Sequence, residues 1–428
     1  MLSYDIESAT AEAVKRIIER GGDVLAPSIA RSRPIVDAVR KEGDAAVTRY
    51  AREFDGHMGD SFLVPIDTIR TAPSRISPAL MSAMTESKRR IETYHSKQRL
   101  KDFEFKDTCG VFGQKVVPLG RIGIYAPGGT ASYASSVLMA AVPARVAGVD
   151  EIALFTPSKS GVIDDAILAA ADIVGIEEVY AIGGAQAIAA MAYGTETVRR
   201  VSKIVGPGGA IVTAAKLLVR KDCEIDFLAG PSEVLIISDS SSDPALIAAE
   251  MLAQLEHDPR AVALTVSTST KVIEESMALL GEMVRTAKRR AIVKASAEKG
   301  AIFLKVRSLK QAVQISNDFA PEHLLIDTRD PEALLDGVKA AGSVFLGRWS
   351  SVAFGDYCAG TNHVLPTMGM ARSRSALSVY DFVRTIPYQR LTRKGAERLA
   401  PVVAEMAKAE GLPAHASAAN ARTGGADK

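Results

Sequence analysis

Residues 151–184 read EIALFTPSKSGVIDDAILAAADIVGIEEVYAIGG, and this stretch decides the fold class. EIALFTP (151–157) has the length and apolar character of a buried strand. AILAAADIVGI (166–176) suits a helix, and EEVYAIGG (177–184) is a second strand-like run. A strand, a helix and another strand in succession make a βαβ unit, which pairs its strands in parallel. The stretch therefore predicts an α/β fold.

The same alternation extends in both directions from this stretch. Upstream, GRIGIYAPGG (120–129) is strand-like and is followed by the helical pattern of residues 132–148. Downstream, a second series of alternating strands and helices runs from about 243 to 347. The chain is therefore predicted to be α/β, with two Rossmann-like lobes that contain parallel sheets. Helical extensions are expected at the N-terminal and C-terminal ends.

Composition changes along the chain suggest four parts. Residues 1–108 are charged and mostly helix-patterned, so they are expected to form a helical extension packed on the core. Residues 109–242 are expected to form the first α/β lobe and residues 243–370 the second. Residues 371–428 form the C-terminal segment. His57 and His95 lie among polar residues of the first part and are expected at the surface.

Overall composition narrows the class of protein. The net charge of +2 over 428 residues gives no strong attraction to nucleic acid or to an anionic membrane. No run of apolar residues is long enough to span a bilayer. The three cysteines are far apart, which favours a reducing compartment over a disulfide framework. With no signal-peptide pattern at the N-terminus, a cytoplasmic enzyme is expected.

Four of the six histidines lie in polar segments close to a carboxylate or carboxamide. These segments are QLEH (254–257), PEH (321–323), GDYCAGTNH (355–363) and EGLPAH (410–415). Imidazole binds metals and titrates near neutral pH, so such segments can serve both metal binding and proton transfer.

Two of these segments have a competing structural explanation. Gln254 and His257 are three residues apart on a helix and can point at one ion, but by itself the pair is more often a surface feature. Glu322 and His323 precede a strand and are expected near the sheet edge where sites form in α/β proteins. They can act as an acid/base pair, or as a capping glutamate beside a packed histidine.

Three glycine-rich turns precede helices, at 128–129, 183–184 and 206–209. Such turns suit a phosphate or pyrophosphate group at a helix N-terminus. None of them matches the dinucleotide fingerprint G-x-G-x-x-G with a later acidic residue. Tight strand-to-helix turns explain these glycines equally well, so the spacing leaves a dinucleotide site open.

Nine motifs, in this order, resemble the histidinol dehydrogenase family from about residue 10 to residue 420. They are GRIGIYAPGG, GGAQAIAAMAYG, KIVGPG, IDFLAGPSE, QLEHDP, APEHL, GSVFLGRW, GDYCAGTNHVLPT and AEGLPAH. The resemblance implies zinc-dependent, NAD-linked oxidation of L-histidinol to L-histidine through L-histidinal, by two successive hydride transfers. This is the last step of histidine biosynthesis. It also implies a homodimer whose active sites are each completed by the partner's C-terminal segment.

The resemblance also implies roles for individual residues. Those matching the family's zinc ligands, which also contact substrate, are Gln254, His257, Asp356 and His415. His323 matches the general base and a substrate contact, and Glu322 matches the residue that activates water for the second oxidation. Further substrate contacts are implied at Ser232, His363 and Glu410, and cofactor contacts at Tyr125, Gln186 and position 209. These ligand types would also accept Mn²⁺ or Co²⁺.

Two departures from the family pattern leave the substrate open. Gly209 stands where the family usually has asparagine, and Ser373-Arg374-Ser375 stands where many relatives have Phe-Ser-Ser. An extra arginine near the site favours an alternative, a paralogue that oxidises another amino alcohol or an anionic polyol such as sulfopropanediol. A zinc-stabilised binding protein without redox chemistry is a third possibility. The retained Glu322 and His323 argue against it, because a binding module needs no acid/base pair.

Overall fold

The computed structural model describes residues 1–5, 25–59, 61–128, 133–158, 161–227 and 230–423. Residues 6–24, which belong to the expected helical extension, lie outside them. The chain divides into two compact units. The first unit comprises Met1–Gln98 and Gly120–Asp381, and the second comprises Arg99–Leu119 and Phe382–Lys428. The two units are described separately below.

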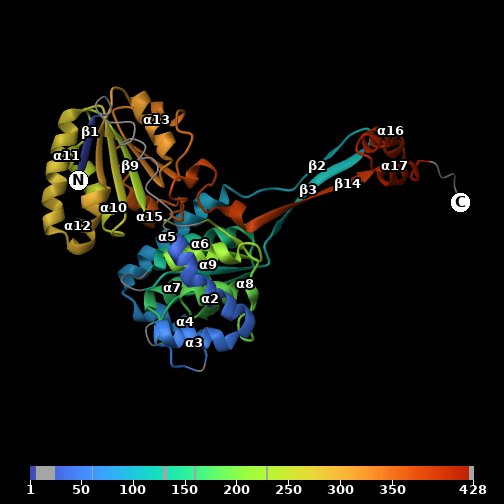
Figure 1. Cartoon of the computed structure of the whole chain (residues 1–428), viewed down its shortest axis with the longest axis horizontal. Helices are drawn as coiled ribbons and strands as arrows, with labels where there is room; N and C mark the ends of the chain where they lie inside the picture. The colour runs from blue at the N-terminus through green and yellow to red at the C-terminus, as the bar shows by residue number, and fades with distance from the viewer. Residues whose placement is uncertain (6–24, 60, 129–132, 159–160, 228–229, 424–428) are drawn as a thin grey trace. The chain divides into compact units, whose positions relative to one another are not determined.

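The first unit contains the parallel sheet that residues 151–184 predict (Figure 1). This first sheet has the strand order β6-β5-β4-β7-β8, with all its pairs parallel. Its strands are β4 (Arg121–Tyr125), β5 (Glu151–Phe155), β6 (Glu178–Tyr180), β7 (Lys203–Val205) and β8 (Glu224–Ile225). The crossover helices are α6 (Ala134–Ala147), α7 (Asp165–Ile173), α8 (Gly184–Tyr193) and α9 (Ala210–Val219). The predicted parallel α/β lobe is therefore confirmed.

N-terminal helices pack on the crossover helices of this lobe. They are α2 (Ala26–Glu42), α3 (Asp44–Asp55), α4 (Ile66–Thr71), the short η1 (Ala72–Arg75) and α5 (Pro78–Ser96). Val36 and Val39 of α2 and Val47 of α3 are buried in one cluster with the alanine-rich face of α8. Small side chains on α8 let the helices approach closely, which gives the dense packing of a protein interior.

A second parallel sheet follows in the same unit, with the order β1-β11-β10-β9-β12-β13. Its strands are β1 (Leu2–Asp5), β9 (Glu233–Ser238), β10 (Val262–Ser267), β11 (Ala301–Lys305), β12 (His323–Asp327) and β13 (Ser343–Leu346). The associated helices are α10 (Pro244–Leu255), α11 (Thr270–Thr286), α12 (Arg290–Gly300), α13 (Leu309–Phe319), α14 (Glu332–Leu335) and α15 (Val352–Tyr357). Short turns η2 (Met370–Arg372) and η3 (Val379–Phe382) follow.

The four central strands of the second sheet, β9 to β12, are buried on both faces. Val234 and Ile236 of β9 face α10, α11 and α12, whereas Leu235 and Ile237 face α13. Because successive side chains of a strand point to opposite faces, a strand covered on both sides needs a continuous apolar run. Figure 1 shows the helices on the two sides of this sheet.

Two strands of the second sheet lie outside the predicted limits of the second lobe. β9 precedes the expected boundary at residue 243, yet it pairs with β10 and β12. β1 comes from the start of the chain, within the expected helical extension, and pairs with β11. Pattern alone gives the presence of a strand but not its neighbours, because pairing depends on contacts distant in sequence.

The expected surface positions of His57 and His95 are also wrong, since both side chains are buried.

The second unit has an antiparallel sheet of its own, in the order β14-β3-β2. Its elements are β2 (Phe103–Lys106), β3 (Gly110–Pro118), β14 (Val383–Leu391), α16 (Arg393–Ala409) and α17 (Pro413–Asn420). β3 and β14 pair along their whole nine-residue lengths, although more than 260 residues separate Pro118 from Val383 in the sequence. β3 therefore does not belong to the first lobe, where its sequence position had placed it.

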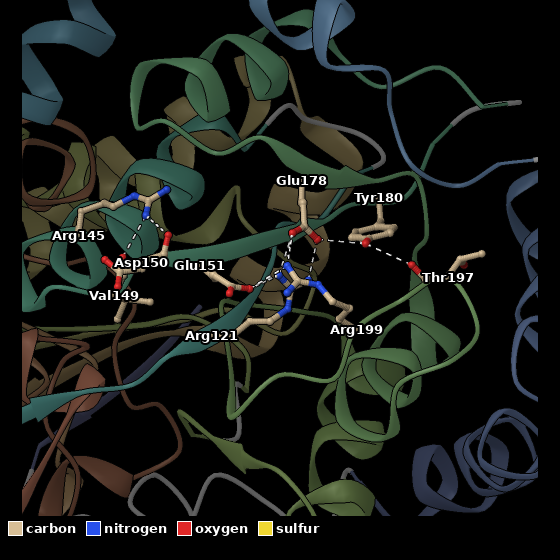
Figure 2. A network of polar contacts seen from close by, with 9 residues as sticks. All are labelled: Arg121, Arg145, Val149, Asp150, Glu151, Glu178, Tyr180, Thr197 and Arg199. Atoms are coloured by element: carbon tan, nitrogen blue, oxygen red, sulfur yellow. Dashed lines mark hydrogen bonds and ion pairs between the residues drawn. The ribbon is translucent and has the colours of Figure 1, made fainter.

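Charged side chains form a network at the amino ends of β4, β5 and β6, at one edge of the first sheet (Figure 2). Arg121 contacts Glu178 at 2.7 Å and Glu151 at 3.1 Å, and Arg199 contacts the same two carboxylates at 2.7 and 2.8 Å. The hydrogen bond from Arg121 lowers the pKa of Glu178 to about 2. These ion pairs tie three neighbouring strands together.

Along the described residues, no helix combines the length and apolar character needed to cross a membrane.

Candidate active site

A cavity of about 480 Å³ lies in the first unit, between opposite edges of its two parallel sheets. The first sheet contributes its carboxyl edge, through Pro127 after β4 and Pro207 to Gly209 after β7. The second sheet contributes its amino edge, through Ser232 just before β9 and Glu322 just before β12. His257, His323, Asp356 and His363 complete the polar part of the lining.

The position of Glu322 and His323 differs from the one expected for an α/β protein. Ligands usually bind beyond the carboxyl ends of parallel strands. Here His323 is the first residue of β12, and its neighbours in register are Val234 of β9 and Ser343 of β13. The acid/base pair therefore lies at the amino edge of its own sheet and faces the carboxyl edge of the other.

Glu322 is a buried carboxyl group at the cavity wall, with 7% of its surface exposed. Its Oε2 accepts a hydrogen bond of 2.8 Å from the backbone N–H of Glu233. Burial raises the pKa of Glu322 to about 8, because the ionised form loses its hydration. The group is therefore mostly protonated at neutral pH.

The backbone carbonyl of Glu233 fixes the orientation of the His323 ring. Its Nδ1 lies 3.0 Å from the carbonyl oxygen of Glu233, which can only accept, so Nδ1–H donates. Its Nε2 lies 3.5 Å from Oδ1 of Asp356 and is the nitrogen that gains or loses a proton when the ring titrates. Burial alone lowers the pKa of His323, but the carboxylates of Glu322 and Asp356 outweigh it and raise the pKa to about 9. Glu322 attracts His323 only when ionised, so the two groups titrate as a pair.

Asp356 lies on α15, and His363 in the loop after this helix contacts both Asp356 and the first lobe. Nδ1 of His363 donates to the backbone oxygen of Asp356 at 2.7 Å. Nε2 of His363 lies 3.3 Å from the hydroxyl oxygen of Ser136, which belongs to α6 of the first lobe. Burial raises the pKa of Asp356, but the neighbouring His323 reverses this and the net shift is downward. The carboxylate is therefore ionised at neutral pH.

Gln254 lies in the last turn of α10, whereas His257 lies beyond the end of this helix at Leu255, so the two are not both on the helix as their spacing predicts. The helix begins at Pro244 after the Asp243 cap, whose side chain accepts from the N–H of Ala245. Gln254 is buried, and its Nε2 has no hydrogen-bond partner among the described residues. His257 lines the cavity. Partial loss of water around its imidazole lowers its pKa. Neutral imidazole is the form that binds a metal.

The four residues expected to bind zinc are divided between the units. Gln254, His257 and Asp356 belong to the first unit, and His415 belongs to the second. Within the described part of the chain, no group of three or more histidine, cysteine, aspartate or glutamate side chains is arranged to hold a metal. The donor types nevertheless suit zinc, since imidazole and carboxylate are among its usual ligands. The side-chain amide nitrogen of Gln254 has no hydrogen-bond partner among the described residues. This is consistent with an amide whose oxygen binds a ligand.

The sequence profile of the family described as histidinol dehydrogenase matches residues 23–423. The chain belongs to this family. A histidinol dehydrogenase of Methanothermobacter thermautotrophicus is 44% identical over 409 residues, covering 94% of this chain and 95% of that protein. One from Pseudomonas syringae pv. syringae is 43% identical over 393 residues, covering 91% and 88%. The crystal structure of histidinol dehydrogenase from Elizabethkingia anophelis superposes with a TM-score of 0.94 at 34% identity, covering 99% and 98%.

The family's expected cofactor positions fall on the carboxyl edge of the first sheet. Tyr125 ends β4; its hydroxyl accepts from the N–H of Gly184 at 3.2 Å, and burial raises its pKa to about 12. Gln186 on α8 is buried, and neither atom of its amide has a hydrogen-bond partner among the described residues. Neither side chain lines the cavity, whereas Gly209 does. Gly129 of the first glycine turn lies outside the described residues.

The remaining expected positions differ in their relation to the cavity. Ser232 and His363 line it. Glu410, which ends α16, and His415, on α17, belong to the second unit and are not among the lining residues. Arg374 is exposed and does not line the cavity either. The expectation that this arginine changes the substrate site is therefore not supported by its position.

Sequence reasoning missed several residues at the cavity. Ser136 and Arg260 line it, and Glu233 holds both members of the acid/base pair through its backbone. Met368, which also lines it, has a positive φ of 54°, a conformation that costs energy for a residue with a Cβ. Glu233 could have been found, because it directly follows Ser232 in the motif IDFLAGPSE. No pattern in the sequence marks Ser136 or Met368.

Proposed function

We propose that this protein oxidises L-histidinol to L-histidine through L-histidinal, with zinc and NAD, as the last step of histidine biosynthesis. The observation that carries the proposal is the acid/base pair Glu322–His323 beside the Asp356 carboxylate at the wall of one cavity. The pair occurs in a chain 43–44% identical to curated histidinol dehydrogenases over nine-tenths of its length.

In this proposal zinc is held by Gln254, His257 and Asp356 of one subunit together with His415 of another. When bound, the ion supplies a positive centre that orients the amine and imidazole of the substrate. Mn²⁺ and Co²⁺ suit the same donors, so the native metal has to be measured. Ser232 and His363 line the same cavity and are proposed to contact the substrate.

His323 is proposed to take the hydroxyl proton of histidinol. Its Nδ1–H is committed to the Glu233 carbonyl, so Nε2 of the neutral imidazole is the atom that accepts the proton. Because the pKa of His323 is raised to about 9, the neutral form that this step needs becomes more abundant as pH rises toward that value. Loss of the hydroxyl proton, and of a hydride from the carbon that bears the hydroxyl, converts the alcohol to the aldehyde. General base catalysis of this kind contributes on the order of 10²–10⁴ to the rate.

Glu322 is proposed to activate the water that adds to the aldehyde. The hydrated aldehyde then loses a second hydride and a proton to give the carboxylic acid. Only ionised Glu322 can accept a proton from water, and its pKa of about 8 makes this form minor at neutral pH. We therefore expect the rate from histidinal to rise with pH up to about 8 and then to level off.

NAD is the proposed acceptor of both hydrides. Tyr125, Gln186 and the turn of residues 206–209 are proposed to contact it. The unbonded amide of Gln186 supports this role, because a buried polar group without a protein partner usually serves a ligand or water. Backbone N–H groups at the start of α9 would serve in place of a side chain at Gly209.

The second unit is proposed to carry Glu410 and His415 into the site of a partner subunit. It exposes large apolar side chains, among them Phe103, Phe105 and Met406. Exposed apolar groups gathered on a small unit favour a protein interface. In a homodimer of this kind, mixing a His323 variant with a His415 variant restores one complete site per dimer, and activity returns. A monomer in solution, or no recovery on mixing, would contradict the shared site.

NADH formation from L-histidinol tests the activity itself. We expect two NADH for each histidinol consumed, loss of activity after chelation, and recovery with Zn²⁺. One NADH per histidinol would remove the aldehyde step from the proposal. No NADH from folded, zinc-loaded protein would overturn the substrate.

A further inference from the structure

A buried ion pair lies behind the cavity, in the first lobe. Lys216 on α9 and Asp226, which follows β8, have side chains only 3% and 1% exposed. Nζ of Lys216 lies 2.6 Å from Oδ1 of Asp226. Neither residue lines the cavity, so the proposed reaction uses neither of them directly.

Among the described residues, the remaining hydrogen bonds of this pair go to one residue, Gly206. Nζ of Lys216 donates to the Gly206 carbonyl oxygen at 2.6 Å, and Oδ2 of Asp226 accepts from the Gly206 N–H at 2.8 Å. Both polar backbone groups of Gly206 are thus bound by the same pair. The peptide groups on either side of Gly206 cannot rotate without breaking a charge-assisted hydrogen bond.

Gly206 is itself held in a conformation that other residues could not adopt. Its φ is +110°, and a Cβ there would lie 2.2 Å from the backbone oxygen of Tyr125. The next three residues, Pro207, Gly208 and Gly209, line the cavity, and α9 begins at Ala210. The pair therefore fixes the point from which the cavity-lining turn starts.

Stability does not explain why a full ion pair occupies this position. Taking two charges out of water costs free energy, and well-packed apolar residues often replace a buried pair without loss of stability. What the charged pair adds is direction, because it binds a donor and an acceptor of one residue at the same time. Glycines at 208 and 209 leave the following turn without side-chain restraints of its own.

We propose that Lys216 and Asp226 are positioning residues that fix the turn of residues 206–209 for binding of the dinucleotide. This inference rests on the proposed use of NAD. The pair acts from behind the turn, holds its first residue, and so lowers the conformational entropy lost when a ligand binds.

The test compares two double variants for NADH binding and for stability. Lys216→Met/Asp226→Leu removes the bonds to Gly206, whereas Lys216→Gln/Asp226→Asn keeps donor and acceptor atoms in place. We expect the apolar variant to weaken NADH binding at least tenfold, measured by calorimetry on metal-free protein, with a melting temperature close to the parent's. We expect the amide variant to bind NADH within about threefold of the parent.

Kinetics separate a positioning role from a general structural one. The apolar variant should raise KM for NAD and leave both KM for histidinol and kcat at saturating NAD nearly unchanged. Lys203→Met is the matched control, since Lys203 is another buried lysine of this sheet but bonds to Asp381 and not to the turn. An apolar variant that folds and binds NADH as tightly as the parent would overturn the proposal.

Hydrogen exchange gives an answer even if the apolar variant does not fold. The parent should protect the Gly206 amide strongly without NADH, and NADH should add little. Fast exchange at Gly206 in the free protein would overturn the proposal. If the parent binds no NADH at all, the proposed cofactor is wrong. That result differs from equally tight NADH binding by the parent and the apolar variant, which overturns only the role of the ion pair.

Discussion

The polar side chains at the two edges of the first sheet differ in how many of their partners the protein supplies. At the amino edge, the side chains of Arg121, Glu151, Glu178 and Arg199 each have ionic partners (Figure 2). Around the carboxyl edge and the cavity, the described residues leave the amide of Gln186, Nε2 of Gln254 and Nε2 of His323 without hydrogen bonds. Unbonded buried polar atoms cost free energy, so they are expected where a ligand completes them.

This contrast distinguishes charge used for stability from charge used for chemistry. A side chain whose charge is matched by ionic partners holds strands together and has little left to offer a substrate, although Nε of Arg121 has no hydrogen-bond partner among the described residues. Substitutions at the amino edge should therefore lower stability and spare the activity of folded protein. Substitutions at the cavity should do the reverse.

The largest expected effect is the loss of the base at the cavity. His323→Asn should lower the rate of histidinol oxidation by on the order of 10²–10⁴. The melting temperature should change little, because asparagine can keep a donor near the Glu233 carbonyl. The measurement is kcat for NADH formation, with bound zinc quantified in parallel. His57→Asn is the control, since His57 is also buried but does not line the cavity. Unchanged turnover by His323→Asn would remove the base assignment.

Glu322→Gln should separate activity from stability by its pH dependence. The pKa of Glu322 is raised from 4.5 to about 8, so folding favours its protonated form. The stability contributed by that form is fully present below about pH 4.5 and is lost as pH rises through about 8. The variant has no such titration, so metal-free Glu322→Gln should lose less stability between pH 5 and about 8.5 in urea unfolding. It should also fail to oxidise histidinal. Parent stability that rises over this interval would contradict the burial argument.

Arg121→Met should show the opposite behaviour at the amino edge. Exposed ion pairs contribute roughly 0–1 kcal/mol, and breaking a buried one costs roughly 3–5 kcal/mol. The Arg121 side chain is 9% exposed while its partners are 30% and 45% exposed, so an intermediate loss is expected. We expect about 2 kcal/mol in chemical unfolding, with unchanged kcat per folded molecule. A fall in kcat without loss of stability would show that this edge also serves the reaction.

The smallest expected effect concerns Gly209, where the cavity has room for a side chain. No heavy atom lies within 4 Å of a Cβ built there. Gly209→Asn should tighten NADH binding by about fivefold, corresponding to about 1 kcal/mol for one added hydrogen bond. Gly120→Asn is a matched control, since its Cβ also meets nothing within 4 Å and it lies before β4, away from the cavity. Equal or weaker NADH binding by Gly209→Asn would indicate that backbone groups alone serve the cofactor here.

Much of the fold and part of the candidate site follow from local patterns. The run from 151 to 184 predicted β5, α7 and β6. The spacing of Gln254 and His257 predicted a helix, and Gln254 lies on α10, although His257 follows its end. Periodicity and capping act over a few residues, so one sequence is enough to detect them. The partners of β1 and β9 were not predictable in this way, since strand pairing depends on residues far apart in the chain.

By itself the sequence determined that the chain is α/β and that it belongs to the histidinol dehydrogenase family, and it led to the proposed acid, base and ligand residues. Only the tertiary structure decided that the amino edge of one sheet faces the carboxyl edge of the other across a cavity. It also decided that Glu322 is buried deeply enough to raise its pKa, and that Lys216 and Asp226 meet at Gly206. The physical reason is that hydration, and therefore proton affinity, depends on every group packed around a side chain, and packing brings together residues that no local pattern relates.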